Sequence, residues 1–240
     1  MINKQSHVPV YAQIEEQLKT QISEQKYPVG TMIPSERELA TQYKVSRMTV
    51  RQALAELVKD GLLRREKGKG TFVANPKLEQ PLNGLTSFTE DMRSRGLEPS
   101  SQIVVFEKKK APFDVRKDLM LEEGEFVYYI IRVRNADGEP MAVERTYLPV
   151  HLFPRLDMTA LESSLYSFIE KQYPYQIGNA IQQMEAARIN KEDATFLNVR
   201  PDAVSLLIKR TSYLKDGRPF ESVHSAYRAD RYKFISEIKR

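Results

Sequence analysis

The sequence predicts an α+β protein with two domains, and three observations point to this class. The chain has 240 residues, and a single domain usually holds about 100–200. Apolar residues recur at helical spacing before residue 60, whereas β-branched and aromatic runs surround Asp-Gly turns in the later part. Residues 1–78 hold 13 Lys and Arg against 8 Asp and Glu, and residues 79–240 hold 24 of each. A basic domain joined to a neutral one suggests an anionic partner for the first, with nucleic acid ahead of a membrane surface.

Two helices are expected before residue 45. Apolar residues at positions 11, 14, 18 and 22 have helical spacing, and Pro28 and Gly30 end that pattern. Ser35 and Glu38 have the spacing of a capping box, in which each side chain hydrogen-bonds the backbone N–H of the other residue. A second helix is therefore expected to begin here and to run to about Tyr43.

A third helix and a short hairpin complete the N-terminal domain, residues 1–75. Ser46 is a suitable N-cap, and the helix is expected to run to about Lys59. Two strand-like runs, 62–66 and 71–74, are joined by the basic turn Lys67-Gly68-Lys69-Gly70. A helix, a short turn, a second helix and a basic hairpin describe a winged helix-turn-helix, whose recognition helix enters the DNA major groove.

The start of the third helix carries the side chains that DNA recognition requires. Arg47, Thr49 and Arg51 lie on its first two turns, and Arg can bind guanine O6 and N7 together, worth about 1–3 kcal/mol of discrimination. The lysines of the hairpin, Lys67 and Lys69, can neutralise phosphates. A solvated basic helix face with ordinary turn glycines is the alternative. The order and spacing of all the parts favour DNA binding.

The rest of the chain is expected to be a linker and a second domain. Residues 76–84 have mixed polarity, two prolines and no sustained period, which is typical of a linker. The second domain, residues 85–240, contains two similar long hairpins, 126–148 and 204–227, each around an Asp-Gly turn, which we interpret as a weak internal repeat. Helices near 164–172 and 192–197 and a strand near 180–187 lie between or beside them. An antiparallel sheet is therefore expected.

Two arginines on one predicted strand suggest an anion site. Arg132 and Arg134 are two residues apart, so both side chains point to the same face of the strand. A solvated pair is the commonest alternative, but the preceding apolar run 127–131 indicates that this strand is substantially buried. Two converging guanidinium groups suit a phosphate group, because each offers a planar pair of donors.

Three further polar positions are candidates, each with a structural alternative. Ser164 begins a predicted helix with Tyr166 in its first turn, so it either completes an anion pocket or simply caps the helix. Glu144 and Glu221 lie four and two residues past the prolines of the two Asp-Gly turns, which places them on equivalent faces. These carboxylates could accept from sugar hydroxyl or ammonium groups. From the residues alone, salt bridges with Arg132, Arg134 or Arg228 are favoured.

The motifs resemble those of a known family. PSERELA (34–40), VSRMTVRQAL (45–54), GLL (61–63) and KGKGTFV (67–73) are similar to the GntR family of bacterial transcription regulators. The C-terminal part resembles the UTRA effector-binding domain of its HutC subfamily, which has a chorismate-lyase-like fold. Within that subfamily, GLTSFTEDMRSRG (84–96), RVR (132–134), Glu144 and the FES, YR and DRY segments resemble repressors of N-acetylglucosamine utilisation.

The resemblance implies a role for each candidate residue. It assigns DNA contacts to Arg37, Arg47 and Gly68, with Ser46, Thr49, Arg51 and Lys69 as helpers. Wings of this family often carry Arg at the position of Lys69, so a phosphate contact is more secure there than base recognition. It assigns the phosphate of the effector to Phe88, Thr89, Arg132, Arg134, Ser164 and Tyr166, and the sugar to Glu144, Glu221 and Tyr227. The implied effector is glucosamine 6-phosphate or N-acetylglucosamine 6-phosphate.

Composition excludes several other classes. The chain has no Cys and three His, which removes disulfides, thiolate metal sites and Cys nucleophiles and leaves little material for a His site. No metal or cofactor is expected. No run of about 20 apolar residues is present to span a membrane, and the N-terminal residues lack the apolar core of a secretion signal. A cytoplasmic location is therefore expected.

We expect a homodimeric repressor that binds a pseudo-palindromic operator. Effector binding is expected to order the loop near Ser87–Glu90 and to re-aim the linker, which weakens operator binding. One alternative is the same machinery with another effector: a different sugar phosphate, an acidic catabolite such as urocanate, or a fatty acid. The others are an enzyme, because the scaffold resembles chorismate lyase, and an architectural DNA-binding protein without an effector.

Overall fold

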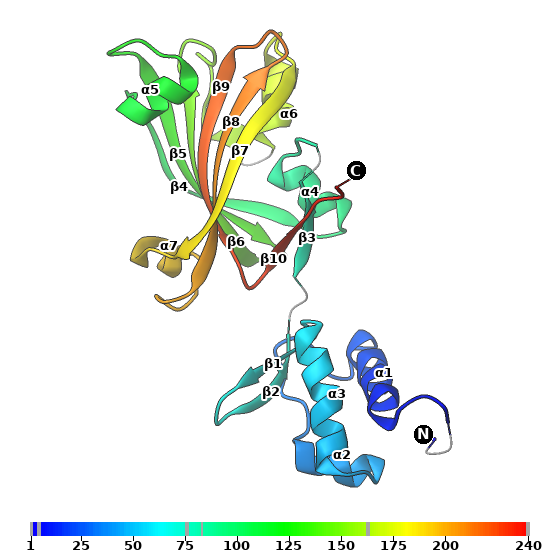
Figure 1. Ribbon diagram of the computed structural model, residues 1–240. Helices are drawn as coiled ribbons and strands as arrows, with labels where there is room; N and C mark the ends of the chain where they lie inside the picture. The colour runs from blue at the N-terminus through cyan, green and yellow to red at the C-terminus, as the bar shows by residue number, and fades with distance from the viewer. Residues whose placement is uncertain (1, 4–5, 75–76, 83, 162–163, 239–240) are drawn as a thin grey trace. The chain divides into compact units, whose positions relative to one another are not determined.

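A computed structural model describes residues 2–3, 6–74, 77–82, 84–161 and 164–238. The chain divides into two compact units, Met1–Leu78 and Glu79–Arg240, which are taken in turn below (Figure 1). Within the described ranges, no helix is long and apolar enough to cross a membrane.

The N-terminal unit contains three helices around one apolar core. The helices are α1 (Val10–Ser23), α2 (Glu36–Tyr43) and α3 (Arg47–Lys59). The capping box is present: the Glu38 backbone N–H donates to Ser35 Oγ at 3.3 Å, and the Ser35 N–H donates to Glu38 Oε2 at 2.8 Å. Fully buried side chains from the three helices form the core, among them Ile14, Leu18, Leu39, Val50, Leu54 and Leu57.

A two-stranded wing follows the helices. Strands β1 (Leu63–Glu66) and β2 (Gly70–Val73) pair antiparallel, with Glu66 opposite Gly70. Gly68 lies at the tip with φ +78°, a left-handed conformation that glycine adopts without strain. The three expected helices and the hairpin are therefore confirmed to within a residue or two.

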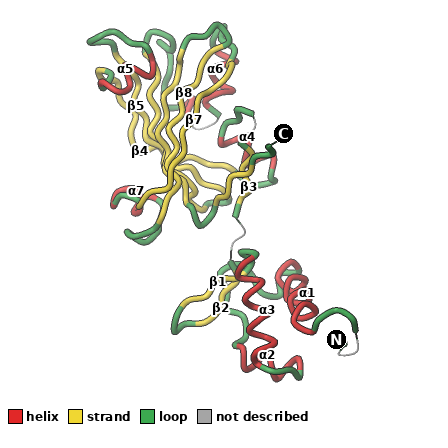
Figure 2. Tube along the Cα trace, in the orientation of Figure 1, coloured by secondary structure: helices red, strands yellow, loops and turns green. Residues whose placement is uncertain are grey.

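The C-terminal unit is built on one six-stranded antiparallel sheet. Its strands are β4 (Pro99–Lys110), β5 (Phe126–Ala136), β6 (Glu139–Pro149), β7 (Ile177–Arg188), β8 (Val204–Leu214) and β9 (Pro219–Arg228). The spatial order is β4-β5-β6-β9-β8-β7, so the two predicted hairpins meet at the centre through β6 and β9. Strand twist makes the strands fan out towards the ends of the sheet (Figure 2).

The internal repeat extends beyond the hairpins. The first copy runs β4, α5 (Phe113–Leu119), β5 and β6, and the second runs β7, α7 (Lys191–Phe196), β8 and β9. Each short helix ends in a left-handed residue, Met120 and Asn198, one position past a leucine. The predicted repeat is therefore one half of a larger β-α-β-β unit that occurs twice.

The two faces of the sheet are covered differently. Odd-numbered residues of β5, such as Ile131 and Val133, pack with Leu197 at the end of α7, and Val127 packs against α5. On the other face, Tyr128 and Ile130 pack beneath α6 (Leu165–Gln172) and the short 3-10 turn Thr159–Leu161. This second face is the one that turns polar further along β5.

Two segments differ from expectation. The expected linker contains a strand, β3 (Leu78–Pro81), which pairs with β10 (Tyr232–Ile235); positions 76 and 83 lie outside the described residues. The expected loop at Ser87–Glu90 is instead the start of helix α4 (Phe88–Ser94), because Ser87 and Glu90 form a second capping box. The Ser87 N–H donates to Glu90 Oε2 at 2.8 Å, which closes that box.

Candidate effector pocket and DNA-binding surface

Strand β5 changes from apolar to charged halfway along one face. Tyr128 and Ile130 belong to the apolar core, and the next two residues on the same face are Arg132 and Arg134. Both arginines are buried, with only 4% and 3% of their surface exposed. The expectation of a buried strand is confirmed, and two positive charges lie where few are found without partners.

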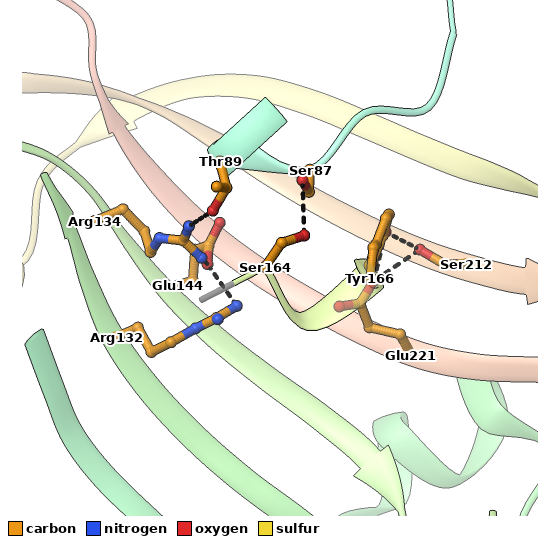
Figure 3. A network of polar contacts seen from close by, with 9 residues as sticks. All are labelled: Ser87, Thr89, Arg132, Arg134, Glu144, Ser164, Tyr166, Ser212 and Glu221. Atoms are coloured by element: carbon orange, nitrogen blue, oxygen red, sulfur yellow. Dashed lines mark hydrogen bonds and ion pairs between the residues drawn. The ribbon is translucent and has the colours of Figure 1, made fainter. Parts of the chain in front are cut away.

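One carboxylate lies between the two guanidinium groups. Arg132 Nη2 and Arg134 Nη1 donate to Glu144 Oε2 at 3.0 and 3.1 Å, because Glu144 lies opposite Arg132 on β6. Arg134 Nη2 also donates to Thr89 Oγ1 at 3.0 Å, and its guanidinium lies 4.6 Å from the ring centroid of Phe88 (Figure 3). The salt bridges that the residues alone favoured are therefore present.

The charges of this cluster do not cancel. Burial opposes ionisation of Glu144, but Arg134 and Arg132 outweigh it and hold its pKa below the ordinary value of 4.5. Burial, together with repulsion from Arg134, lowers the pKa of Arg132 to about 10, so this group stays protonated at neutral pH. Two cations therefore share one anion. Among the described residues, Arg132 Nε and Nη1 and Arg134 Nε have no hydrogen-bond partner.

A second polar cluster lies beside the first. The Tyr166 hydroxyl donates to Glu221 Oε2 at 2.8 Å, and Ser212 Oγ donates to the same oxygen at 2.9 Å (Figure 3). Burial raises the pKa of Glu221 above its ordinary value of 4.5, although both hydroxyl groups favour its ionised form. Burial and the neighbouring Glu221 also raise the pKa of Tyr166. Tyr166 is thus directed at Glu221 rather than at the arginine pair.

Ser164 has both of the roles weighed for it. Its Oγ accepts from the Ser167 backbone N–H at 3.3 Å, which caps α6. The same hydroxyl donates to Ser87 Oγ at 3.2 Å, so it also joins the first turns of α6 and α4. Figure 3 places this contact between the two polar clusters.

All nine predicted effector residues line one small cavity of about 40 Å³. They come from α4, β5, β6, α6 and β9, and are Phe88, Thr89, Arg132, Arg134, Glu144, Ser164, Tyr166, Glu221 and Tyr227. Glu144 and Tyr227 also line a larger cavity of about 380 Å³, bounded on another side by Gln80, Pro81 and Leu82. Most of the space for a ligand therefore adjoins the charged clusters.

Arg210 is a residue of this pocket that the sequence analysis missed. It lines both cavities, and its Nε and Nη2 donate to Gln182 Oε1 at 2.9 and 2.6 Å. A signal was available: the Asp216-Gly217 turn sets Ser212 opposite Glu221, and Arg210 shares their face two residues away. With Arg210 included, the pocket has three guanidinium groups and two carboxyl groups.

In the N-terminal unit, two predicted DNA-contacting arginines are exposed. Arg37 lies in the first turn of α2 and Arg47 begins α3, and neither forms a hydrogen bond or ion pair with any described residue. Ser46 caps α3 by accepting from the Thr49 backbone N–H at 3.1 Å, and the two hydroxyl groups lie 2.9 Å apart. Ser46 and Thr49 therefore have structural roles that hold the start of the recognition helix.

The other predicted DNA-contacting residues are partly engaged. Arg51 forms a two-pronged ion pair with Glu36 of α2, with Nη2 3.0 Å and Nε 3.2 Å from Oε2. Lys69 lies 3.3 Å from Glu66 at the base of the wing, whereas Gly68 faces open space at its tip. Across the described part of the chain, no group of three His, Asp or Glu residues is placed to hold a metal ion.

A winged helix-turn-helix joined to a unit with a buried cationic pocket defines a DNA-binding regulator that responds to a small ligand. The family description "Bacterial regulatory proteins, gntR family" matches residues 10–73, and "UTRA domain" matches residues 94–233. The chain therefore belongs to the gntR family of bacterial regulatory proteins, in its HutC-type branch with a UTRA domain.

Similar proteins are regulators along their whole length. The HTH-type transcriptional repressor NagR of Bacillus subtilis is 45% identical, with 100% of this chain and 98% of the relative covered. The mannosyl-D-glycerate transport/metabolism system repressor MngR of Escherichia coli is 34% identical, with 98% of each covered. The crystal structure of PhnF from Mycobacterium smegmatis has a TM-score of 0.68 and 31% identity, covering 95% of this chain and 98% of the other. This chain is a transcriptional repressor of the same type, not an enzyme.

Proposed function

We propose that this repressor controls genes for the uptake and catabolism of an amino sugar, and that a phosphorylated amino sugar releases it from its operator. The observation that carries the proposal is the buried arginine pair, which shares one carboxylate and lines a polar cavity. The 45% identity to the repressor named NagR supports the same class of effector.

A phosphate group suits the charge of the first cluster. Arg132 and Arg134 carry two positive charges against one on Glu144, and a phosphate monoester carries about −1.5 to −2 at pH 7. The three unpartnered arginine nitrogens are donors directed at acceptors that the protein does not supply. Both desolvation and orientation of the guanidinium groups are complete before a ligand arrives, which favours tight binding.

The sugar suits the neighbouring groups. Glu221 accepts two hydrogen bonds already, Glu144 accepts two, and Tyr227 presents a hydroxyl group to the larger cavity. Carboxylate and phenol groups are acceptors and donors for sugar hydroxyl and ammonium groups. Arg210 joins the proposed site, because it lines both cavities.

In the DNA-binding unit, we propose that Arg37, Arg47, Gly68 and Lys69 contact operator DNA, with Arg51 released from Glu36 on binding. The exposed, unpaired state of Arg37 and Arg47 supports this assignment. Two copies of the chain would form a homodimer in the cytoplasm and bind two half-sites of a pseudo-palindrome. Sedimentation of the purified protein with and without operator DNA tests the stoichiometry, and one monomer per operator would contradict it.

Thermal unfolding against a ligand panel tests the effector. The panel contains glucosamine 6-phosphate, N-acetylglucosamine 6-phosphate, both unphosphorylated sugars and glucose 6-phosphate. A ligand at 100 times its Kd adds about 2.7 kcal/mol, which is several degrees at roughly 2–4 °C per kcal/mol. We expect a shift with the phosphorylated amino sugars only. A shift with glucose 6-phosphate alone would keep the regulator and change the effector, and no shift with any sugar phosphate would reject the proposal.

The variant Arg134→Lys tests the site itself. It keeps the charge of Arg134 but loses the planar pair of donors, so we expect the ligand-induced shift to fall while operator binding is retained. Arg200→Ala is the matched control, because Arg200 is exposed and pairs only with Asp202 among the described residues. An undiminished response in Arg134→Lys would place the phosphate elsewhere.

A further inference from the structure

Helix α4 joins the proposed pocket to strand β3. Phe88 and Thr89 lie in its first turn and line the small cavity, and Arg95 caps its other end. A seven-residue helix behaves as a short rigid rod of about 10 Å. A displacement at its first turn is therefore passed to Arg95 with little loss.

The side chain of Arg95 connects the helix with the strand. Its Nη2 donates to Asp91 Oδ1 on α4 at 2.7 Å and to Gln80 Oε1 on β3 at 3.2 Å. Its Nη1 donates to the backbone carbonyl of Glu79 at 2.5 Å. The Arg95 and Asp91 side chains are 20% and 12% exposed, so this fork is largely shielded from water.

Strand β3 depends on few other contacts. It has four residues and pairs with one neighbour, β10, in a separate two-stranded sheet. A two-stranded ribbon is marginally stable without further packing. Besides that pairing, Glu79 forms an ion pair with Lys233 at 2.6 Å. Arg95 is therefore a substantial part of what holds β3 against the effector-binding unit.

Strand β3 is also close to the wing along the chain. The wing strand β2 ends at Val73 and β3 begins at Leu78, so four residues separate them. Four residues span at most about 14 Å, which leaves little slack to absorb a movement of β3. In addition, Gln80, Pro81 and Leu82 line the larger cavity, so a ligand there meets α4 and β3 together.

We infer that Arg95 is a positioning residue that couples the effector pocket to the segment leading to the wing. The inference rests on the proposed function, because it concerns how binding of the effector reaches the DNA-binding unit. Ligand binding shifts the start of α4, the Arg95 fork moves with the helix, and the hold on Glu79 and Gln80 changes with it. Arg95 itself contacts neither cavity, so its loss separates binding from response.

The test compares Arg95→Ala with Arg93→Ala. Arg93 is an exposed arginine on the same helix with no hydrogen bond or ion pair to any described residue, which makes it a matched control. Operator Kd is measured by fluorescence anisotropy with and without saturating glucosamine 6-phosphate or its N-acetyl form, and effector Kd by calorimetry. Typical couplings between two sites are about 5–150-fold. We expect Arg95→Ala to keep effector Kd within about threefold and to lose most of that coupling.

A conservative variant and a second position guard against misfolding. Arg95→Lys keeps one donor and is expected to restore part of the coupling, whereas Gln80→Ala removes one acceptor and is expected to lower it partially. Arg93→Ala is expected to behave as wild type. Full coupling in Arg95→Ala, or loss of effector binding in it, would overturn the inference.

Hydrogen exchange separates this inference from the proposed function. In Arg95→Ala, the backbone N–H of Leu82, which donates to the Ile235 carbonyl at 2.9 Å, is expected to exchange about tenfold faster than in Arg93→Ala. Unchanged exchange would overturn the role of Arg95 without reference to any sugar. A wild-type protein that ignores both sugar phosphates would instead reject the effector, and the exchange result would still decide whether Arg95 holds β3.

Discussion

The effector pocket and the DNA-binding surface use the same residue type in opposite ways. In the pocket, Arg132 and Arg134 are buried and are held by Glu144 and Thr89 without any ligand. On the DNA-binding surface, Arg37 and Arg47 are exposed and form no ion pair with a described residue. The first pair is pre-organised in a low-dielectric site, and the second is solvated.

This difference has consequences for energy and for specificity. A buried, fixed pair contributes strongly when its partners are complete and costs much when one is removed. Exposed arginines gain their energy from released counterions and from base contacts, so their contribution depends on salt and on DNA sequence. The sensor is therefore expected to be sensitive to single substitutions in stability, and the DNA-binding surface in affinity only.

The largest expected effect comes from breaking the pocket's internal pairing. Glu144→Gln removes the anion shared by Arg132 and Arg134, and breaking a buried pair typically lowers the free energy of unfolding by about 3–5 kcal/mol. Urea unfolding measures this loss. Inorganic phosphate is expected to stabilise Glu144→Gln more than wild type, because it replaces the missing anion. In the control Glu192→Gln, an exposed partner of Arg145 is lost, and a change below about 1 kcal/mol is expected. Equal losses in both variants would contradict the contrast.

The next effect concerns base recognition. Arg47→Ala is expected to cost about 1–3 kcal/mol on operator DNA and to cost less on random DNA. Lys69→Ala is expected to weaken both DNAs alike and to reduce the salt slope by about 1. Titrations at several salt concentrations give both quantities. If the two variants behave alike on both DNAs, Arg47 contacts phosphate rather than a base.

A pH effect distinguishes the two carboxyl groups of the pocket. Burial raises the folded-state pKa of Glu221, so the stability it contributes is full below about 4.5 and is lost as pH rises through the raised pKa. Glu144 has a lowered folded-state pKa, so its contribution is present above about 4.5 and is lost as pH falls through the lowered value. One proton changes the free energy of unfolding by up to about 1.4 kcal/mol per pH unit. Glu221→Gln is expected to remove the decline above pH 4.5 in urea unfolding, and an unchanged profile would contradict it.

The smallest effect concerns Arg51. Glu36→Gln releases Arg51 and removes a negative charge from the DNA-binding surface, so operator binding is expected to strengthen slightly and its salt slope to steepen. The loss in free energy of unfolding is expected to stay below about 1 kcal/mol, because the pair is largely exposed. Weaker operator binding in Glu36→Gln would mean that Glu36 orients Arg51 in the complex.

Local signals explain most of what the sequence predicted correctly. The three N-terminal helices begin at capping residues and carry a sustained apolar period, and the two long hairpins form around Asp-Gly turns. At the first turn, Asp137 and Gly138 both have positive φ, as a tight hairpin requires. Helix α4 was missed although Ser87 and Glu90 repeat the signature of Ser35 and Glu38, because seven residues are too few to show a period.

The missed features depend on distant partners. β3 and β10 are four-residue strands about 150 positions apart, and neither has a local pattern that distinguishes it from a loop. The ion pair between Glu36 and Arg51 depends on how α2 packs against α3, which no spacing rule gives. The nine proposed effector residues were predicted because the family resemblance supplied what the residues left open. Arg210 was missed because no hairpin register was drawn from the Asp216-Gly217 turn.

The central pairing of β6 with β9 also has a kinetic consequence. It joins residues as far apart as Ala142 and Tyr227, while each hairpin closes over a short stretch of chain. Hairpins form in about 1–10 μs, but joining segments distant in sequence is slow because a long loop must close first. The arginine pair lies on one hairpin and Glu221 on the other, so the complete pocket exists only after this late step. An effector is therefore expected to slow unfolding of the repressor many-fold and to leave its folding rate almost unchanged.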